Sequence, residues 1–131
     1  MHSRINSIMK KKRIIIVEDH EEMQFLYSIM FRKEHDIEIA AQVTDADEAL
    51  RRLEELNPDL VLIDISLPGK SGIDFTKIVR KSHPGLKILI VTGYEPNRFY
   101  DIAKKAGADD LIMKSDIRQI IKAVRRLLGI E

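Results

Sequence analysis

LVLIDISLPGKSGID, residues 60–74, places four large apolar residues directly before a carboxylate and then breaks at Pro68-Gly69. An ionised carboxylate is costly to bury unless another group pairs with it. Asp64 therefore either begins a turn, as Asp often does, or is the functional end of a buried strand. The rest of the chain provides the means to choose between these two interpretations.

The composition is that of one ordinary globular domain. The chain has 131 residues, 44% of them apolar and 33% charged, and a net charge of +1, which favours neither nucleic acid nor a membrane as a partner. No apolar run approaches the ~20 residues of a membrane span. The absence of Cys excludes disulfides and thiolate chemistry and fits a reducing, cytoplasmic location. We expect a flexible leader over residues 1–12 and a single domain over residues 13–129.

Apolar periodicity predicts strands that alternate with helices along the whole domain. The predicted strands span residues 13–19, 37–43, 60–63, 87–91 and 111–113. The predicted helices span residues 21–33, 44–56, 72–82 and 96–106, and a last one starts at residue 116. Thr44 and Asp116 are the expected N-caps, Pro96 the expected helix start and Gly107 the expected C-cap. This alternation predicts an α/β fold, with one parallel sheet covered by helices on both faces.

Reactive side chains stand at the carboxyl ends of the predicted strands, where parallel sheets bind ligands. Glu18 and Asp19 end the first strand, Asp64 the third, Thr92 the fourth and Lys114 the fifth. Three facing carboxylates repel one another unless a cation lies among them, and Mg²⁺ (or Mn²⁺) suits such an oxygen-rich site. Asp64 is then placed to attack phosphorus as a carboxylate nucleophile.

The sequence resembles the receiver domain of a two-component response regulator. The matching stretches are IIIVEDH at 14–20, TDADEAL at 44–50, LVLIDISLPGKSGID at 60–74, ILIVTGY at 88–94 and AGADDLIMKSD at 106–116. They occur in order, and the resemblance covers residues 13–128. The resemblance implies a five-stranded parallel sheet in the order 2-1-3-4-5, and a switch that a sensor histidine kinase phosphorylates.

The resemblance also implies a role for each site residue. Asp64 matches the phosphoacceptor, and Glu18 and Asp19 match the acidic pair that binds Mg²⁺ together with the backbone carbonyl of Ser66. Thr92 matches the switch hydroxyl, and Lys114 matches the phosphate-binding lysine. The side chains of Ser66 and Tyr94 are expected to line the pocket and tune hydrolysis. The protein would catalyse its own phosphoryl transfer and dephosphorylation without being a turnover enzyme on a small molecule.

Two positions depart from the family pattern. Many members carry Tyr or Phe three residues before the lysine, where this chain has Leu111, and often a cis-proline after it, where this chain has Ser115. We therefore expect a smaller or differently routed change on phosphorylation, and a different path for the loop before the last helix. His20, His35 and His83 show no ligand spacing and are interpreted as surface residues.

Simpler interpretations exist for each residue. Glu18 and Asp19 could be an acid pair favoured by a helix dipole, Thr92 an ordinary strand residue and Lys114 a surface lysine. A phosphatase with an aspartyl nucleophile, or a metal-dependent nuclease, would require a second Asp at the position of Ser66. A degenerate receiver that acts only as an interaction module is the remaining alternative, and the presence of all five key residues argues against it.

We expect no output domain within this chain, no direct nucleic-acid binding and no membrane association. Residues 96–121 are the surface expected to contact an output domain or a second copy. The chain is either a stand-alone receiver or a receiver from a longer transcription regulator whose linker begins near Gly129.

Overall fold

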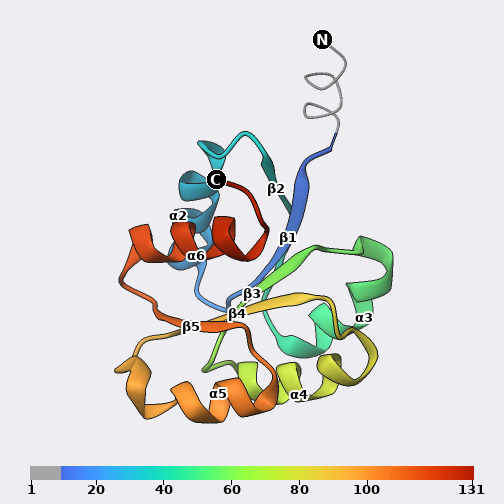
Figure 1. The fold of residues 1–131 in the computed structure, drawn as a ribbon, viewed down its shortest axis with the longest axis vertical. Coiled ribbons are helices and arrows are strands. Elements are labelled where there is room, and N and C mark those ends of the chain that lie inside the picture. The colour runs from blue at the N-terminus through green and yellow to red at the C-terminus, as the bar shows by residue number, and fades with distance from the viewer. Residues whose placement is uncertain (1–9) are drawn as a thin grey trace.

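The computed structural model describes residues 10–131, which form a five-stranded parallel sheet between two layers of helices (Figure 1). The strands lie in the order β2-β1-β3-β4-β5, so the predicted fold class and strand order are confirmed. The strands are β1 (Lys12–Val17), β2 (Ile37–Val43), β3 (Leu60–Asp64), β4 (Lys87–Thr92) and β5 (Asp110–Met113). The helices are α2 (Glu21–Arg32), α3 (Ala46–Leu56), α4 (Gly72–Ser82), the 3₁₀ turn η1 (Pro96–Arg98), α5 (Tyr100–Ala106) and α6 (Ile117–Leu127).

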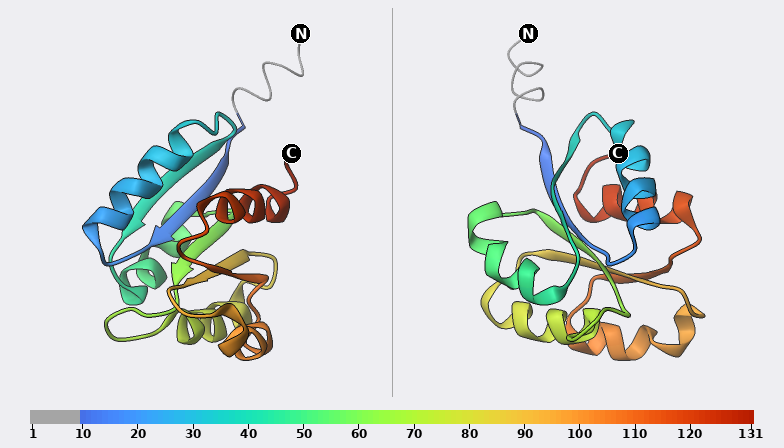
Figure 2. Two further views of the ribbon diagram at one scale, coloured as in Figure 1. Left: turned by 90° about the vertical axis from the view of Figure 1, so that its left-hand side faces the viewer. Right: turned by 180° about the vertical axis from the view of Figure 1, so that it is seen from behind.

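The central strands are buried on both faces, as their unbroken apolar runs predict. Every residue of β3 is buried, and successive side chains point to opposite faces. Val61 and Ile63 belong to the core under α3, α4 and α5, whereas Leu60 and Leu62 belong to the core under α2 and α6. Figure 2 shows the two helical layers from two further directions. The sheet is therefore a rigid platform whose carboxyl edge carries Asp64.

Several element starts differ from the prediction. The N-cap of α3 is Asp45 rather than Thr44, because the Asp45 side chain accepts a hydrogen bond from the Glu48 amide at 2.8 Å. Strand β1 begins at Lys12, inside the predicted leader, where it pairs with Ile37 of β2. Residues 1–9 of that leader lie outside the described residues.

The segment after β4 is also less regular than predicted. Pro96 opens a short 3₁₀ turn rather than the α-helix, and α5 begins only at Tyr100. Gly107 is the C-cap of α5 with φ of 111°, and Asp116 caps α6 by accepting from the Gln119 amide, so both of these predicted caps are confirmed. Within residues 10–131, none of the helices has the length and apolar character that crossing a membrane requires.

Candidate functional site

The structure brings the predicted strand-end residues together at the carboxyl edge of the sheet. Glu18 and Asp19 follow β1, Asp64 ends β3, Thr92 ends β4 and Lys114 follows β5. Strands β1, β3, β4 and β5 are consecutive neighbours in the sheet. The parallel topology alone therefore makes these side chains converge, although they are up to about a hundred residues apart in the chain.

Lys114 joins the two most deeply buried acids. Its Nζ lies 2.7 Å from Asp64 Oδ2 and 2.7 Å from Glu18 Oε1. Glu18 is 0% exposed and Asp64 is 3% exposed. Burial by itself lowers the pKa of Lys114, but the contacts with Asp64 and Glu18 outweigh burial and leave that pKa above its ordinary value. Lys114 is therefore held as a charged ammonium among the carboxylates.

The acidic cluster has the donor set of a divalent-metal site. One ligand atom from each of Glu18, Asp19, His20 and Asp64 lies within 4.8 Å of all the others. Within the described residues, Asp19 Oδ1 is buried without a hydrogen-bond partner, so a cation could take that place. Three carboxylates against one ammonium leave two formal negative charges, which a divalent ion would match. These residues therefore fit Mg²⁺ or Mn²⁺.

The other predicted residues surround this cluster. Thr92 is 0% exposed, and its hydroxyl oxygen accepts a hydrogen bond from the Tyr94 amide at 3.0 Å. The Ser66 amide donates to Asp64 Oδ1 at 3.1 Å. Ser66 and Tyr94 line, with His20, Asp64, Gly93 and Lys114, a pocket of about 360 Å³. That pocket gives a small anionic group access to the Asp64 carboxylate.

Local sequence signals fix the backbone around Asp64. Ser71 and Asp74 form a capping box that starts α4, with hydrogen bonds of 3.0 and 3.1 Å. At Gly72, a Cβ atom would lie only 2.6 Å from the backbone oxygen of Asp64. The absence of a side chain at Gly72 therefore allows α4 to begin directly against the end of β3.

His20 is the site residue that sequence reasoning missed. The side chain is 65% exposed, as expected of a surface residue, but its Nδ1 lies 3.0 Å from Glu18 Oε2. The hydrogen bond to Glu18 and the charges of Asp19 and Glu18 raise the pKa of His20. The available signal was its position directly after the acid pair. His35 is exposed as predicted.

Tyr27 is a second residue that the sequence did not single out. This α2 residue is 1% exposed, and its hydroxyl has no hydrogen-bond partner within the described residues. Burial raises the pKa of its phenol, and the charges of Glu18 and Asp64 raise it further. The carboxylates of the site therefore disfavour ionisation of a phenol in the core that α2 covers.

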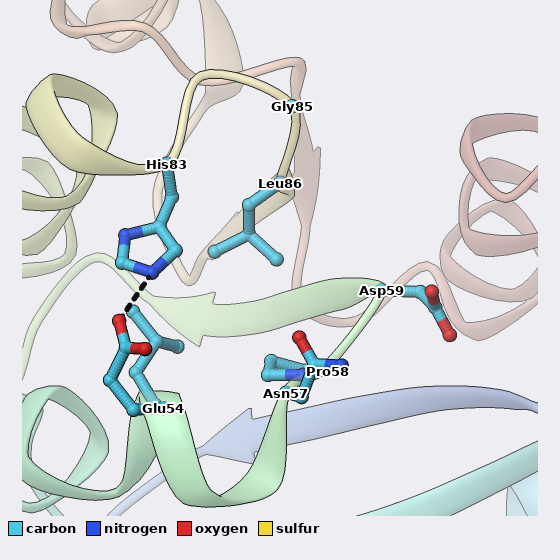
Figure 3. A pocket seen from close by; sticks show the side chains of 8 residues that line it. Glu54, Asn57, Pro58, Asp59, His83, Gly85 and Leu86 are labelled. Carbon is cyan, nitrogen blue, oxygen red and sulfur yellow. Dashed lines mark hydrogen bonds and ion pairs between the residues drawn. The ribbon is translucent and has the colours of Figure 1, made fainter.

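A second pocket, of about 270 Å³, lies outside this cluster (Figure 3). It contains His83, whose Nε2 lies 3.1 Å from Glu54 Oε2. His83 is half-buried rather than fully exposed, because this contact joins it to α3. The pocket includes none of the predicted site residues; its lining residues are Leu53, Glu54, Asn57, Pro58, Asp59, His83, Gly85 and Leu86.

Comparison with known families gives one match that spans most of the chain. Residues 14–125 match the family described as "Response regulator receiver domain". The chain is 34% identical over 115 residues to the oxygen regulatory protein NreC of Staphylococcus epidermidis, and 29% identical over 114 residues to the response regulator GacA of Pseudomonas viridiflava. Each alignment covers 86% of this chain and 53% of the relative. The chain thus spans about half the length of these relatives.

Solved structures show the same architecture. A LuxR-family two-component response regulator from Aurantimonas sp. SI85-9A1 superposes with a TM-score of 0.86 at 32% identity, covering 91% of this chain and 86% of that one. A LuxR-family DNA-binding response regulator from Staphylococcus aureus superposes with a TM-score of 0.80 at 27% identity, covering 89% of this chain and 98% of that one.

Proposed function

The chain belongs to the response regulator receiver domain family, and from that premise we propose that it is a signalling switch that accepts a phosphoryl group on Asp64. The proposed donor is the phosphohistidine of a sensor histidine kinase. The observation that carries the proposal is the position of Asp64: its carboxylate ends a buried strand, contacts the Lys114 ammonium at 2.7 Å and opens into a pocket. Family members are signalling proteins rather than enzymes that turn over a small molecule.

The proposed reaction is one in-line displacement at phosphorus. A carboxylate oxygen of Asp64 forms a bond to phosphorus as the bond from phosphorus to the donor's imidazole nitrogen breaks, and the electron pair of that bond leaves with the imidazole. The product is an acyl phosphate. Lys114 would supply positive charge for a phosphoryl oxygen, and the hydroxyl of Thr92, which ends the adjacent strand β4, would donate a hydrogen bond to another.

Glu18, Asp19 and Asp64 are the carboxylates that would hold Mg²⁺ or Mn²⁺, with the Ser66 carbonyl as a further ligand implied by the family. When bound, the ion supplies charge neutralisation, so that an anionic donor can approach three carboxylates. Burial of Glu18 and the Ser66 amide on Asp64 Oδ1 hold these side chains in position. Positioning of charged groups in this way is most of what phosphoryl transfer requires from a protein.

The switch would be read out through residues 92–121. The Lys114 amide donates to the Thr92 carbonyl at 2.6 Å, so a change at either residue is transmitted to the ends of both β4 and β5. Tyr100 and Ile102 of α5 are 41% and 51% exposed. This exposed apolar material supports contact with an output domain or a second copy of the chain.

Intact-mass measurement after incubation with phosphoramidate and Mg²⁺ tests the proposal. The wild-type protein should gain one labile phosphoryl group, whereas Asp64→Asn should gain none. Asp59→Asn is the matched control, because Asp59 lies just before the same strand at its other end and should not alter labelling. EDTA should abolish labelling of the wild type.

Labelling of Asp64→Asn to the wild-type level would contradict the proposal. Absence of labelling in the folded wild type, with kinase or with small donors, would favour the interaction module instead.

A further inference from the structure

His20 occupies a helix-capping position without capping the helix. It is the N-cap residue of α2, where Ser, Thr, Asp and Asn are the residues that satisfy free amides. Its side chain makes no capping hydrogen bond. The ring instead turns back to the acid pair, with Nδ1 at 3.0 Å from Glu18 Oε2 and 3.4 Å from Asp19 Oδ1. Helix capping therefore does not explain this orientation.

The two oxygens of Glu18 face different side chains. Oε1 lies 2.7 Å from Nζ of Lys114, and Oε2 lies 3.0 Å from Nδ1 of His20. The His20 ring and Asp19 Oδ1 are thus beside the Glu18 oxygen that does not contact Lys114. Within residues 10–131, Asp19 Oδ1 is also one of the buried oxygens without a hydrogen-bond partner. This group of atoms combines two carboxylate oxygens and one imidazole nitrogen.

The spacing of these atoms fits one octahedral ion. Adjacent ligands of an octahedral ion held at about 2.1 Å lie about 3.0 Å apart. The distances from His20 Nδ1 to the Glu18 and Asp19 oxygens are 3.0 and 3.4 Å, close to that value. Asp64 adds a further oxygen within 4.8 Å of the others.

We propose that His20 is a fourth side-chain ligand at this site and gives it a preference for octahedral first-row transition-metal ions over Mg²⁺. The inference rests on the proposed metal-dependent function of the acidic cluster. Mg²⁺ is a hard ion that prefers oxygen, whereas imidazole binds the later transition-metal ions well. Replacement of the imidazole should therefore weaken transition-metal binding much more than Mg²⁺ binding.

Calorimetric titration of Co²⁺ and of Mg²⁺, at one alkaline pH so that imidazole is deprotonated, measures this preference. In His20→Ala, the Co²⁺ affinity should fall about tenfold or more, whereas the Mg²⁺ affinity should change less than about twofold. His20→Gln offers an oxygen in place of nitrogen and should likewise retain Mg²⁺ and lose Co²⁺. His35→Ala and His83→Ala are matched controls that should retain both affinities.

Nuclear magnetic resonance of the Co²⁺ complex gives a readout independent of affinity. The wild type should show a paramagnetically shifted ring resonance that His20→Ala lacks and His35→Ala retains. An unchanged Co²⁺ to Mg²⁺ affinity ratio in His20→Ala, with normal Mg²⁺ binding, would overturn the role of His20 while the proposed function stands. If the wild type bound neither Co²⁺ nor Mg²⁺, the metal site of the proposed function itself would be overturned.

Discussion

Asp19 is the residue at which stability and the proposed function oppose each other. Lys114 contacts the Glu18 and Asp64 carboxylates, whereas Asp19 Oδ1 is buried without a hydrogen bond. The negative charges of Asp19, Glu18 and Asp64, which lie within 4.8 Å of one another, repel and destabilise the folded state. A cation bound by Asp19, as the proposed function requires, would remove this repulsion.

Asp19→Asn should therefore be more stable than the wild type in metal-free buffer, by about 1 kcal/mol in the free energy of unfolding. Saturating Mg²⁺ should reduce or reverse that gain, because the variant loses a ligand. Urea unfolding with and without Mg²⁺ provides the measurement, and Glu55→Gln, at an exposed position of α3, is the control. Equal stability of Asp19→Asn and the wild type in both buffers would contradict the account.

Gly72 is a second residue whose substitution should lower stability by a defined mechanism. A Cβ atom there would lie 2.6 Å from the Asp64 backbone oxygen, so Gly72→Ala must push α4 away from β3. The cost should be about 1 to 3 kcal/mol, with slower phosphorylation because Asp64 moves. Gly85→Ala is the matched control, since a Cβ atom there meets nothing within 4 Å. Chemical denaturation should separate the two variants, and equal loss of stability would show that the close approach is unimportant.

The sequence predicts which residues form the site but not the distances between their side chains. Asp64, Thr92 and Lys114 were predictable because the topology brings the carboxyl ends of parallel strands to one edge. The contact of the His20 ring with Glu18 depends on the direction of a side chain after a strand end. The approach of Gly72 to Asp64 depends on the packing of α4 against β3, which no local pattern reports.

Between elements, Arg125 links α6 to the turn between α2 and β2. Its guanidinium binds Asp36 through two hydrogen bonds, at 2.8 and 3.0 Å, and Glu34 at 2.9 Å. The hydrogen bonds from Arg125 hold the pKa of Asp36 below its ordinary value of 3.8. A lowered carboxyl pKa in the folded state stabilises the protein above the unfolded-state pKa, and that contribution disappears as the pH falls through the folded-state pKa.

Asp36→Asn should therefore lower stability at neutral pH and have a diminishing effect as the pH falls below about 3.8. Because Asp36 is 46% exposed, solvent screening limits the loss to about 1 kcal/mol. Arg125→Lys keeps the charge but not the two-pronged geometry, so it should lose part of that stability. Urea titrations across this pH range would contradict the account if Asp36→Asn and the wild type differed equally at every pH.

Element types were predictable, whereas some starts were not. Thr44 and Asp45 are adjacent residues that can each cap a helix, and only the folded backbone shows that the Asp45 side chain reaches Glu48. Pro96 is compatible with an α-helix and with a 3₁₀ turn, because both accept its fixed φ. Asn57-Pro58 and Gly107 gave unambiguous helix ends, because their backbone preferences allow few alternatives.

In the whole molecule, we expect the structural response to phosphorylation to spread from the pocket along one side of the domain. Beryllofluoride mimics the acyl phosphate, and its binding should change amide hydrogen exchange mainly in residues 92–121. Thr92→Val keeps the branched shape but removes the hydroxyl, so it should lose most of this response. Leu111 cannot form the hydrogen bond that a tyrosine would, and the change should therefore be modest in size.

Thr76→Val is the matched control for that measurement. It removes another buried threonine hydroxyl, which bonds the Gly72 carbonyl in α4. The response in residues 92–121 should persist in this variant. A response confined to the pocket, or equally strong in Thr92→Val, would mean that the signal leaves by another route.

The position of the phosphoryl group is the most direct test of the central claim. Borohydride converts an aspartyl phosphate to homoserine, so peptide sequencing of the reduced, phosphorylated protein identifies the acceptor. We expect homoserine at position 64, with Asp19, Asp59 and Glu18 unchanged. Homoserine at another position, or an unmodified Asp64 in protein that carries the phosphoryl group, would contradict it.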